Sequence, residues 1–249
     1  MRVPVVSIIV VSIAVGLSIP VLADRKQAKE EQVCVNELKA LIETESIETD
    51  LVVESKEELK KELCPQESVY ESQYNFDTLR EENKDIIAWI NIPGTNVDYP
   101  VLFDGTDEYL HKNLGGEDSA SGSIYVDATT KNVLDDEINI IYGHNMKNGT
   151  MFGELQKFKD NDYFESHPYI EIHTPNEVRV YQIFSVRDVS SDIDTLNFAL
   201  SDFSKKEYIE KAINESIQSR EVAESQIITL STCVGDYSRR LLVSGVRIH

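Results

Sequence analysis

From about residue 74 to the C-terminus, this chain repeats short runs of β-branched and apolar residues separated by polar, turn-forming segments. The clearest runs are Ile138–Tyr142, Tyr169–His173, Gln226–Thr232 and Arg240–Val246. Runs of this length and composition are typical of β-strands with a buried face. A segment of this size can also bury one sizeable core. We therefore expect residues 74–249 to form a single, mainly β domain, and the many short strands predict a β-barrel.

Three segments of this domain have a helical pattern instead. They are Asp77–Asn83, Met151–Phe158 and Lys205–Ser219. In the last segment the apolar residues recur at the spacing of one helical face, which comprises Tyr208, Ile209, Ala212, Ile213 and Ile217. The domain is therefore expected to be α+β, with strands in the majority.

The N-terminus is almost wholly apolar from Val3 to Ala23, with Arg2 before this run and charged residues directly after it. Its length suits one membrane-spanning helix. Pro20–Ala23 also fits the small-residue end of a cleavable signal peptide. Both alternatives export residues 24–249, so we expect residues 1–23 to be a signal or membrane anchor.

Residues 24–73 are rich in glutamate and contain few aromatic residues. Ser55–Glu58 has the spacing of a capping box, and Pro65 would end that helix. This composition predicts an acidic, helical stalk exposed to solvent. Cys34 and Cys64 both lie in the stalk, where they could pair in an oxidising exterior or remain free thiols. The formal net charge of −20 argues against nucleic acid as a partner.

Three residues with side chains that could be catalytic lie at the ends of three predicted strands. Cys233 closes one strand, and a thiolate there would be a nucleophile whose population depends on nearby positive charge. Arg240 opens the next strand, so Val234–Arg239 would form a hairpin turn that brings Arg240 beside Cys233. An arginine in this place can stabilise a thiolate or an oxyanion. His144 follows Ile138–Tyr142 and could protonate a departing amine. By themselves, a lone cysteine and a lone histidine at strand ends are also common as core and loop residues.

Several segments together resemble one family. Thr229–Cys233 with Arg240 downstream resembles the active-site motif of sortases, the cysteine transpeptidases of Gram-positive bacterial surfaces. Ile140–Met146, followed by Asn148–Gly153, is similar to the histidine segment of class B sortases. Further matches occur in the expected order and are Trp89–Thr95, Asp98–Val101 and Gly122–Asp127. The resemblance covers the whole of the predicted domain.

This resemblance implies a sortase-type eight-stranded β-barrel with N-terminal helices and a long helix before the cysteine strand. It also implies Cys233 as the nucleophile, His144 as general acid and then base, and Arg240 as the stabiliser of the oxyanion or substrate. Arg239 is the alternative arginine. Adjacent strand residues point to opposite faces, so only one of the two can reach the cleft. We expect Arg240, because the family motif places its arginine directly before the apolar strand.

The resemblance also suggests residues that line the substrate groove. The candidates are Tyr142, Ser231, Thr232, Asp98 and Leu102. Some class B members carry an acidic residue two positions after the cysteine. This chain has Gly235 there and Asp236 one position later, so no acid is assigned as a third catalytic member.

No metal or other cofactor is implied by the resemblance, and no spacing of His, Cys and Asp suggests zinc. The acidic loop Asp104–Glu108 could bind calcium, although a solvated turn is the simpler alternative. The implied reaction cleaves the C-terminal sorting signal of a surface protein at a Thr–X bond. It then transfers the protein through a thioacyl-enzyme to an amine of a peptidoglycan precursor.

Two alternatives to this predicted function remain: a pilin-polymerising sortase that uses a lysine amine, and a non-catalytic surface module. The expected location is the Gram-positive cell membrane, crossed once by the N-terminal segment, with the catalytic domain outside.

Overall fold

The computed structural model describes residues 36, 38–39, 72–191, 204–235 and 238–249. The predicted anchor, Cys34, Cys64, nearly all of the stalk and Asp236 lie outside these residues. Among the described residues, no helix has the length and apolarity needed to cross a bilayer.

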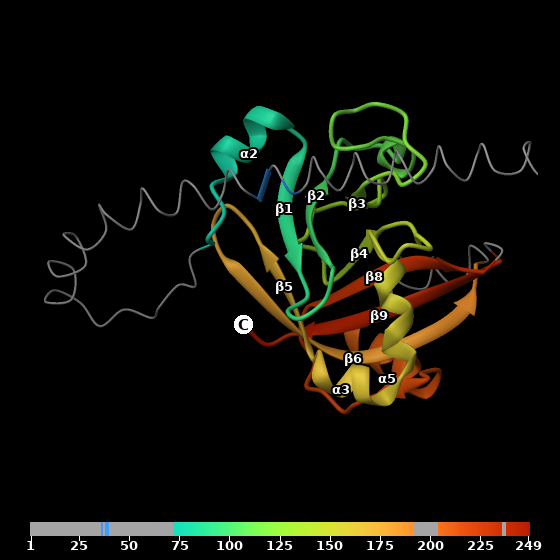
Figure 1. The fold of residues 1–249 in the computed structure, drawn as a ribbon. Coiled ribbons are helices and arrows are strands. Elements are labelled where there is room, and N and C mark those ends of the chain that lie inside the picture. The colour runs from blue at the N-terminus through green and yellow to red at the C-terminus, as the bar shows by residue number, and fades with distance from the viewer. Residues whose placement is uncertain (1–35, 37, 40–71, 192–203, 236–237) are drawn as a thin grey trace, which may run out of the picture.

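Eight strands form a closed barrel (Figure 1). Around the barrel they follow the order β5 (Tyr169–His173), β1 (Ile86–Asn91), β2 (Asp98–Leu102), β3 (Ile124–Val126), β4 (Ile138–Tyr142), β8 (Ile227–Val234), β9 (Arg239–Arg247) and β6 (Val178–Ser190). The pairing of β6 with β5 closes the ring, and the short β7 (Gln218–Ser219) adds to β6. The predicted eight-stranded β-barrel is confirmed.

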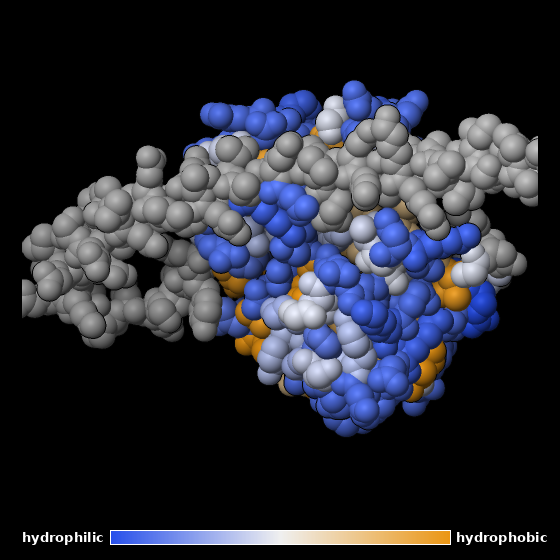
Figure 2. Space-filling view, in the orientation of Figure 1, coloured by the Kyte–Doolittle hydropathy of each residue, from blue (hydrophilic) through white to orange (hydrophobic). Residues whose placement is uncertain are grey.

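Apolar residues from every barrel strand fill the interior, as the alternation of side chains along a strand requires. On β8, Ile228 and Leu230 face this core, whereas Ile227 packs in a separate cluster with the helix α5 on the outer face. Thr229 and Cys233 alternate with the core residues and therefore share the outer face. The outer face of β4, β8 and β9 is thus the surface on which Cys233 lies. Figure 2 shows that the surface visible in this view is mostly hydrophilic.

Each of the three α-helices begins where a side chain satisfies its first N–H groups, whereas the two 3₁₀ helices have no side-chain cap. They are α2 (Phe76–Glu82), α3 (Asn161–Ser166) and α5 (Lys205–Asn214), with the 3₁₀ helices η1 (Glu108–Leu110) and η2 (Gly153–Lys159). Asn75 caps α2 and Asp160 caps α3. Ser204 and Glu207 form a capping box at the start of α5. The first predicted helix therefore agrees with α2 to within one residue at each end.

The other two helix predictions need correction. The segment predicted as Met151–Phe158 is the 3₁₀ helix η2, which begins at Gly153. The helix predicted as Lys205–Ser219 ends at Asn214 and is only ten residues long. The N–H of Ile217 instead donates to the carbonyl of Val186 at 2.8 Å, and β7 then pairs with β6. The chain leaves the helix to extend the sheet, and Ile217 is exposed and not on a buried helical face.

Candidate active site

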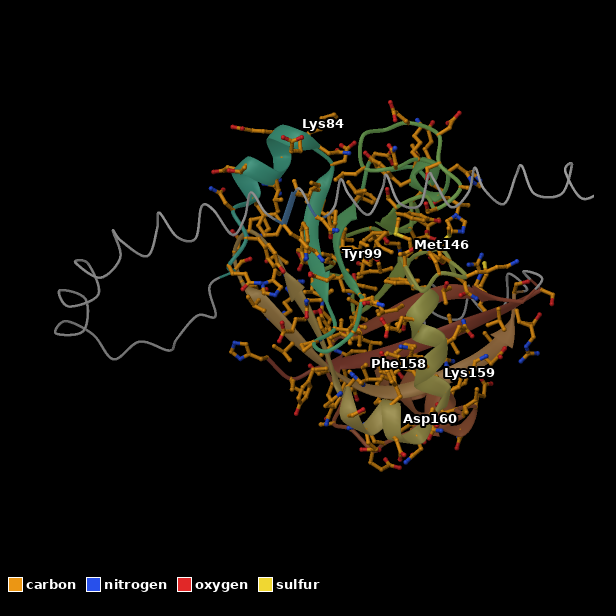
Figure 3. All side chains as sticks on the ribbon, in the orientation of Figure 1. Lys84, Tyr99, Met146, Phe158, Lys159 and Asp160 are labelled. Atoms are coloured by element: carbon orange, nitrogen blue, oxygen red, sulfur yellow. The ribbon has the colours of Figure 1, made fainter. Side chains whose placement is uncertain are left out.

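Parallel pairing of β4 and β8 brings the histidine and cysteine segments to the same edge of the sheet. Tyr142 pairs with Ser231, and the N–H of Gly143 donates to the carbonyl of Ser231 at 3.2 Å. Parallel neighbours run in the same direction, so His144 and Cys233 both follow this paired row at the same end of the barrel. Met146, which is labelled in Figure 3, marks the loop that carries His144.

The hairpin of β8 and β9 places Arg240 directly opposite Cys233. The Nη1 of Arg240 donates to the Sγ of Cys233 at 3.7 Å. Both side chains are only partly buried. This contact places a permanent positive charge beside the sulfur, where it can stabilise negative charge that develops during attack on a carbonyl. The predicted proximity of Cys233 and Arg240 across the hairpin is confirmed.

Arg239 points to the other face of β9. Its Nε donates to Oδ1 of Asp188 at 2.6 Å and its Nη2 to the Asp188 carbonyl at 2.7 Å. Lys159 on η2, labelled in Figure 3, donates to the second carboxylate oxygen at 2.8 Å. Burial raises the pKa of the Asp188 carboxyl, but the hydrogen bonds from Lys159 and Arg239 outweigh burial and hold it below its ordinary value. The prediction that the two arginines face opposite ways is confirmed.

The ring of His144 is held by a backbone group. Its Nε2 lies 2.7 Å from the carbonyl oxygen of Leu110, the last residue of η1. A carbonyl only accepts hydrogen bonds, so Nε2 carries the hydrogen. The ring of His111 lies nearby, with the two centroids 6.5 Å apart.

A side-chain amide ties the histidine segment to the backbone of the cysteine. The Nδ2 of Asn145 donates to the carbonyl of Cys233 at 2.8 Å. Gln156 on η2 approaches the same carbonyl with its Nε2 at 3.4 Å. These amides satisfy a carbonyl beyond the last pair of the β4–β8 ladder, so they fix the backbone that carries the thiol relative to His144.

A continuous row of outer-face residues runs across the sheet beside this site. Strand register aligns Leu102, Tyr125, Tyr142, Ser231 and Leu242. The rings of Tyr125 and Tyr142 stack with centroids 5.5 Å apart, and the guanidinium carbon of Arg240 lies 5.8 Å from the Tyr142 centroid. Burial, followed by the charge of Asp127, raises the pKa of Tyr142 far above its ordinary value. The phenol therefore stays protonated.

The sequence-predicted groove residues fall into two groups. Tyr142, Ser231 and Leu102 share the row next to Cys233, although Ser231 and Leu102 are fully buried. Thr232 is fully buried and alternates to the opposite face of β8, so the structure does not bring it to the cleft.

Asp98 lies at the far end of β2 from Leu102 and is engaged elsewhere. It accepts a hydrogen bond from Nε1 of Trp89 at 2.7 Å. It also forms an ion pair with Lys39, with 2.6 Å between Nζ and Oδ2. Burial raises the pKa of Asp98, but Lys39 and Trp89 hold it below its ordinary value. The structure therefore does not bring Asp98 together with Cys233.

Sequence reasoning missed the supporting residues of the site. The Leu110 carbonyl is a backbone group that no motif reveals. Asn145 was visible in principle, because it directly follows His144 in the segment that resembles sortases. Among the described residues, no group of three or more His, Cys, Asp and Glu side chains could hold a metal ion.

Comparison with known proteins gives consistent matches. The profile of the Sortase domain family matches residues 90–248. The chain is 36% identical to sortase B of Listeria monocytogenes over 177 residues, which cover 67% of this chain and 71% of that protein. It is similar to the crystal structure of Clostridium perfringens sortase B, with a TM-score of 0.64, 32% identity and coverage of 70% of this chain and 100% of that chain. It is also similar to a Staphylococcus aureus sortase B–substrate complex, with a TM-score of 0.68, 25% identity and coverage of 90% and 100%.

Proposed function

Because the chain belongs to the sortase family of cysteine transpeptidases, and within it to class B, we propose that it anchors surface proteins to the cell wall. In this proposal it cleaves a C-terminal sorting signal at a Thr–X bond and transfers the new carboxyl end to an amine of a peptidoglycan precursor. The observation that carries the proposal is the contact between Arg240 and Sγ of the partly exposed Cys233. This contact lies at the end of the barrel where His144 follows the neighbouring strand β4. The structure of the S. aureus sortase B–substrate complex, which this fold resembles, supports a substrate bound by this barrel.

The first half of the reaction forms a thioester. The Cys233 thiolate attacks the Thr carbonyl carbon, and the electron pair of the C=O bond moves to oxygen. Arg240 stabilises this oxyanion. Its guanidinium already reaches the attacking sulfur through Nη1, at 3.7 Å, so it lies beside the carbon at which the oxyanion forms. His144 then protonates the leaving amine as the C–N bond breaks, which releases the C-terminal peptide.

The second half reverses these roles. The acceptor amine attacks the thioester carbonyl and loses a proton to His144, and the C–S bond breaks to regenerate the thiolate. In this scheme Tyr142, beside Arg240 on the outer face, forms part of the floor on which the sorting signal lies, and the buried Ser231 supports it from the neighbouring strand. Tyr142 stacks on Tyr125, and burial keeps its phenol protonated, so it presents an uncharged surface to the peptide.

In this proposal the enzyme is held at the cell membrane and acts on its outer side. Residues 1–23 would anchor it in the membrane, residues 24–73 would form the acidic stalk, and residues 74–249 would act outside the cell. The apolar length of Val3–Ala23 and the family membership support this organisation.

The function is tested with the full chain in detergent and a panel of fluorescent peptides that contain Thr–X bonds. Each peptide is incubated without an amine, with triglycine, with a peptidoglycan-precursor amine and with a lysine-containing peptide. We expect faster turnover with the precursor amine and a ligated product. Preference for the lysine peptide would support pilin polymerisation instead, and hydrolysis unaffected by every amine would contradict transpeptidation.

Replacing Arg240 with alanine is expected to lower the rate of acylation by about 10²–10³-fold, because the variant loses the donor to the oxyanion. Arg240→Lys should recover only part of this loss, since an ammonium lacks the planar fork of the guanidinium. The matched control is Arg239→Ala, which removes the neighbouring guanidinium that faces Asp188 and should leave acylation near the wild-type rate. Stopped-flow measurement of the first turnover separates the variants. Equal losses for both arginines would contradict the assignment.

A further inference from the structure

We infer that the backbone carbonyl of Leu110 is the orienting partner of His144 and that Gly122 is the residue that keeps this carbonyl in place. The inference rests on the proposed function, because it assigns the nitrogen through which His144 moves protons. With the hydrogen of the neutral ring held on Nε2 by Leu110, Nδ1 is the nitrogen that exchanges the proton with the leaving and attacking amines. A carbonyl fixes the ring in this way without placing a negative charge beside it.

The geometry of the contact supports a defined tautomer. The Nε2···O separation of 2.7 Å is at the short end of the range for N–H···O hydrogen bonds. Leu110 contributes an acceptor and no donor through this oxygen, so the partner nitrogen must be the protonated one. A histidine whose one nitrogen is held by a carbonyl has its ring orientation and tautomer set together.

The turn that carries Leu110 is anchored on both sides. The hydroxyl of the buried Tyr109 donates to Oδ2 of Asp85 at 2.9 Å, which ties η1 to the start of β1. The N–H of Ser123 donates to the Tyr109 carbonyl at 2.9 Å, and the N–H of Ser119 donates to the His111 carbonyl at 2.7 Å. The returning segment therefore occupies the carbonyls before and after Leu110, and the carbonyl between them is directed to His144.

Gly122 packs directly against this carbonyl. It has a φ of +54°, and a Cβ added there would lie 2.4 Å from the Leu110 oxygen and 2.9 Å from its carbonyl carbon. At such distances the backbone must shift, because the atoms that the Cβ meets belong to the main chain of Leu110 and Tyr109 and not to a flexible side chain. A side chain at this position is therefore expected to displace the group that holds His144. Gly122 is thus a positioning residue that acts through Leu110.

The same loop offers a matched control. Gly116 also has a positive φ, of +80°, but a Cβ added there meets nothing within 4 Å. Alanine at either position brings the strain of a left-handed backbone. Only Gly122→Ala adds a collision with the Leu110 carbonyl, so the difference between the two variants isolates the positioning effect.

The test combines a spectroscopic and a kinetic readout on the full chain in detergent. Long-range ¹H–¹⁵N correlation spectra of the labelled wild type, at a pH where the ring is neutral, report which nitrogen of His144 carries the hydrogen, and His144→Gln assigns the signal. We expect the Nε2–H tautomer in the wild type and in Gly116→Ala. Gly122→Ala should show a mixture of tautomers and a kcat that falls by about 10²-fold, as expected for a misplaced catalytic group. Its KM should change little.

The outcomes separate this inference from the proposed function. A wild-type His144 with its hydrogen on Nδ1 overturns the inference even if the enzyme is fully active. A wild type that transfers no peptide contradicts the function, while its spectrum still reports the tautomer. If Gly122→Ala does not fold while Gly116→Ala does, the wild-type spectrum still decides the role of Leu110, and the loss of folding contradicts a role of Gly122 confined to positioning. Equal kinetic losses in Gly122→Ala and Gly116→Ala would assign the effect to backbone strain and reject the positioning role.

Discussion

Replacing Cys233 with alanine is expected to abolish the thioacyl-enzyme and to lower peptide transfer by at least about 10⁴-fold, the scale seen when a catalytic nucleophile is removed. Among the residues that the structure describes at this strand end, Arg240 is a cation and Ser231 is fully buried, so neither can replace the thiol as nucleophile. Mass spectrometry of the intact protein after mixing with a sorting peptide measures the adduct directly. The wild type should gain the mass of the acyl fragment, and the variant should not.

Two controls sharpen this result. Cys233→Ser keeps the size of the side chain and should also lack the adduct at neutral pH, because a hydroxyl is far less acidic than a thiol. Both variants should retain the wild-type melting temperature, since Cys233 is only partly buried and its backbone contacts are unchanged. A Cys233→Ala protein that still supported normal surface display in cells would point to the non-catalytic surface module.

Replacing His144 with alanine is expected to slow cleavage of peptide substrates by about 10²–10⁴-fold, the usual contribution of general acid–base catalysis. The reason is that an amine leaves only when it is protonated. A depsipeptide, in which the scissile amide is an ester, has a leaving group that needs less help from an acid. The loss in His144→Ala should therefore be much smaller for the ester than for the amide, as measured by acylation rates on the matched pair.

The neighbouring His111 provides the control for this experiment. Its ring lies 6.5 Å from that of His144 between centroids and is exposed, so His111→Ala should leave both substrates near wild-type rates. Equal losses for the ester and the amide in His144→Ala would indicate a positioning effect and contradict the role as general acid.

The strands were predictable because each is short, apolar and bounded by turn residues. The match of Ile138–Tyr142 and Tyr169–His173 to β4 and β5 illustrates this point. The end of α5 was not predictable in the same way. Ile217 fits the helical periodicity, but its N–H finds a partner on β6, and a tertiary hydrogen bond overrides a local preference.

The candidate groove residues show a similar limit. Thr232 and Ser231 are adjacent in the chain, and only the phase of β8 decides that Ser231 shares the face of Cys233 while Thr232 does not. Asp98 matches a family segment, yet its hydrogen bond with Trp89 and ion pair with Lys39 hold it away from the site. A motif match places a residue in the chain, whereas its contacts determine what it can touch.

The sequence by itself determined the barrel of short strands, the thiol, imidazole and guanidinium that gather at strand ends, and the choice of Arg240 over Arg239. The strands follow from local periodicity, and the alternation of side chains along a strand means that only one of the two arginines can share the face of Cys233. The resemblance to the sortase motif indicated that this arginine is Arg240. The tertiary structure alone decided how His144 is held, because its partner is the backbone carbonyl of Leu110 on a distant turn. Every residue has such a carbonyl, so only the folded path of the chain can select the one that faces the ring.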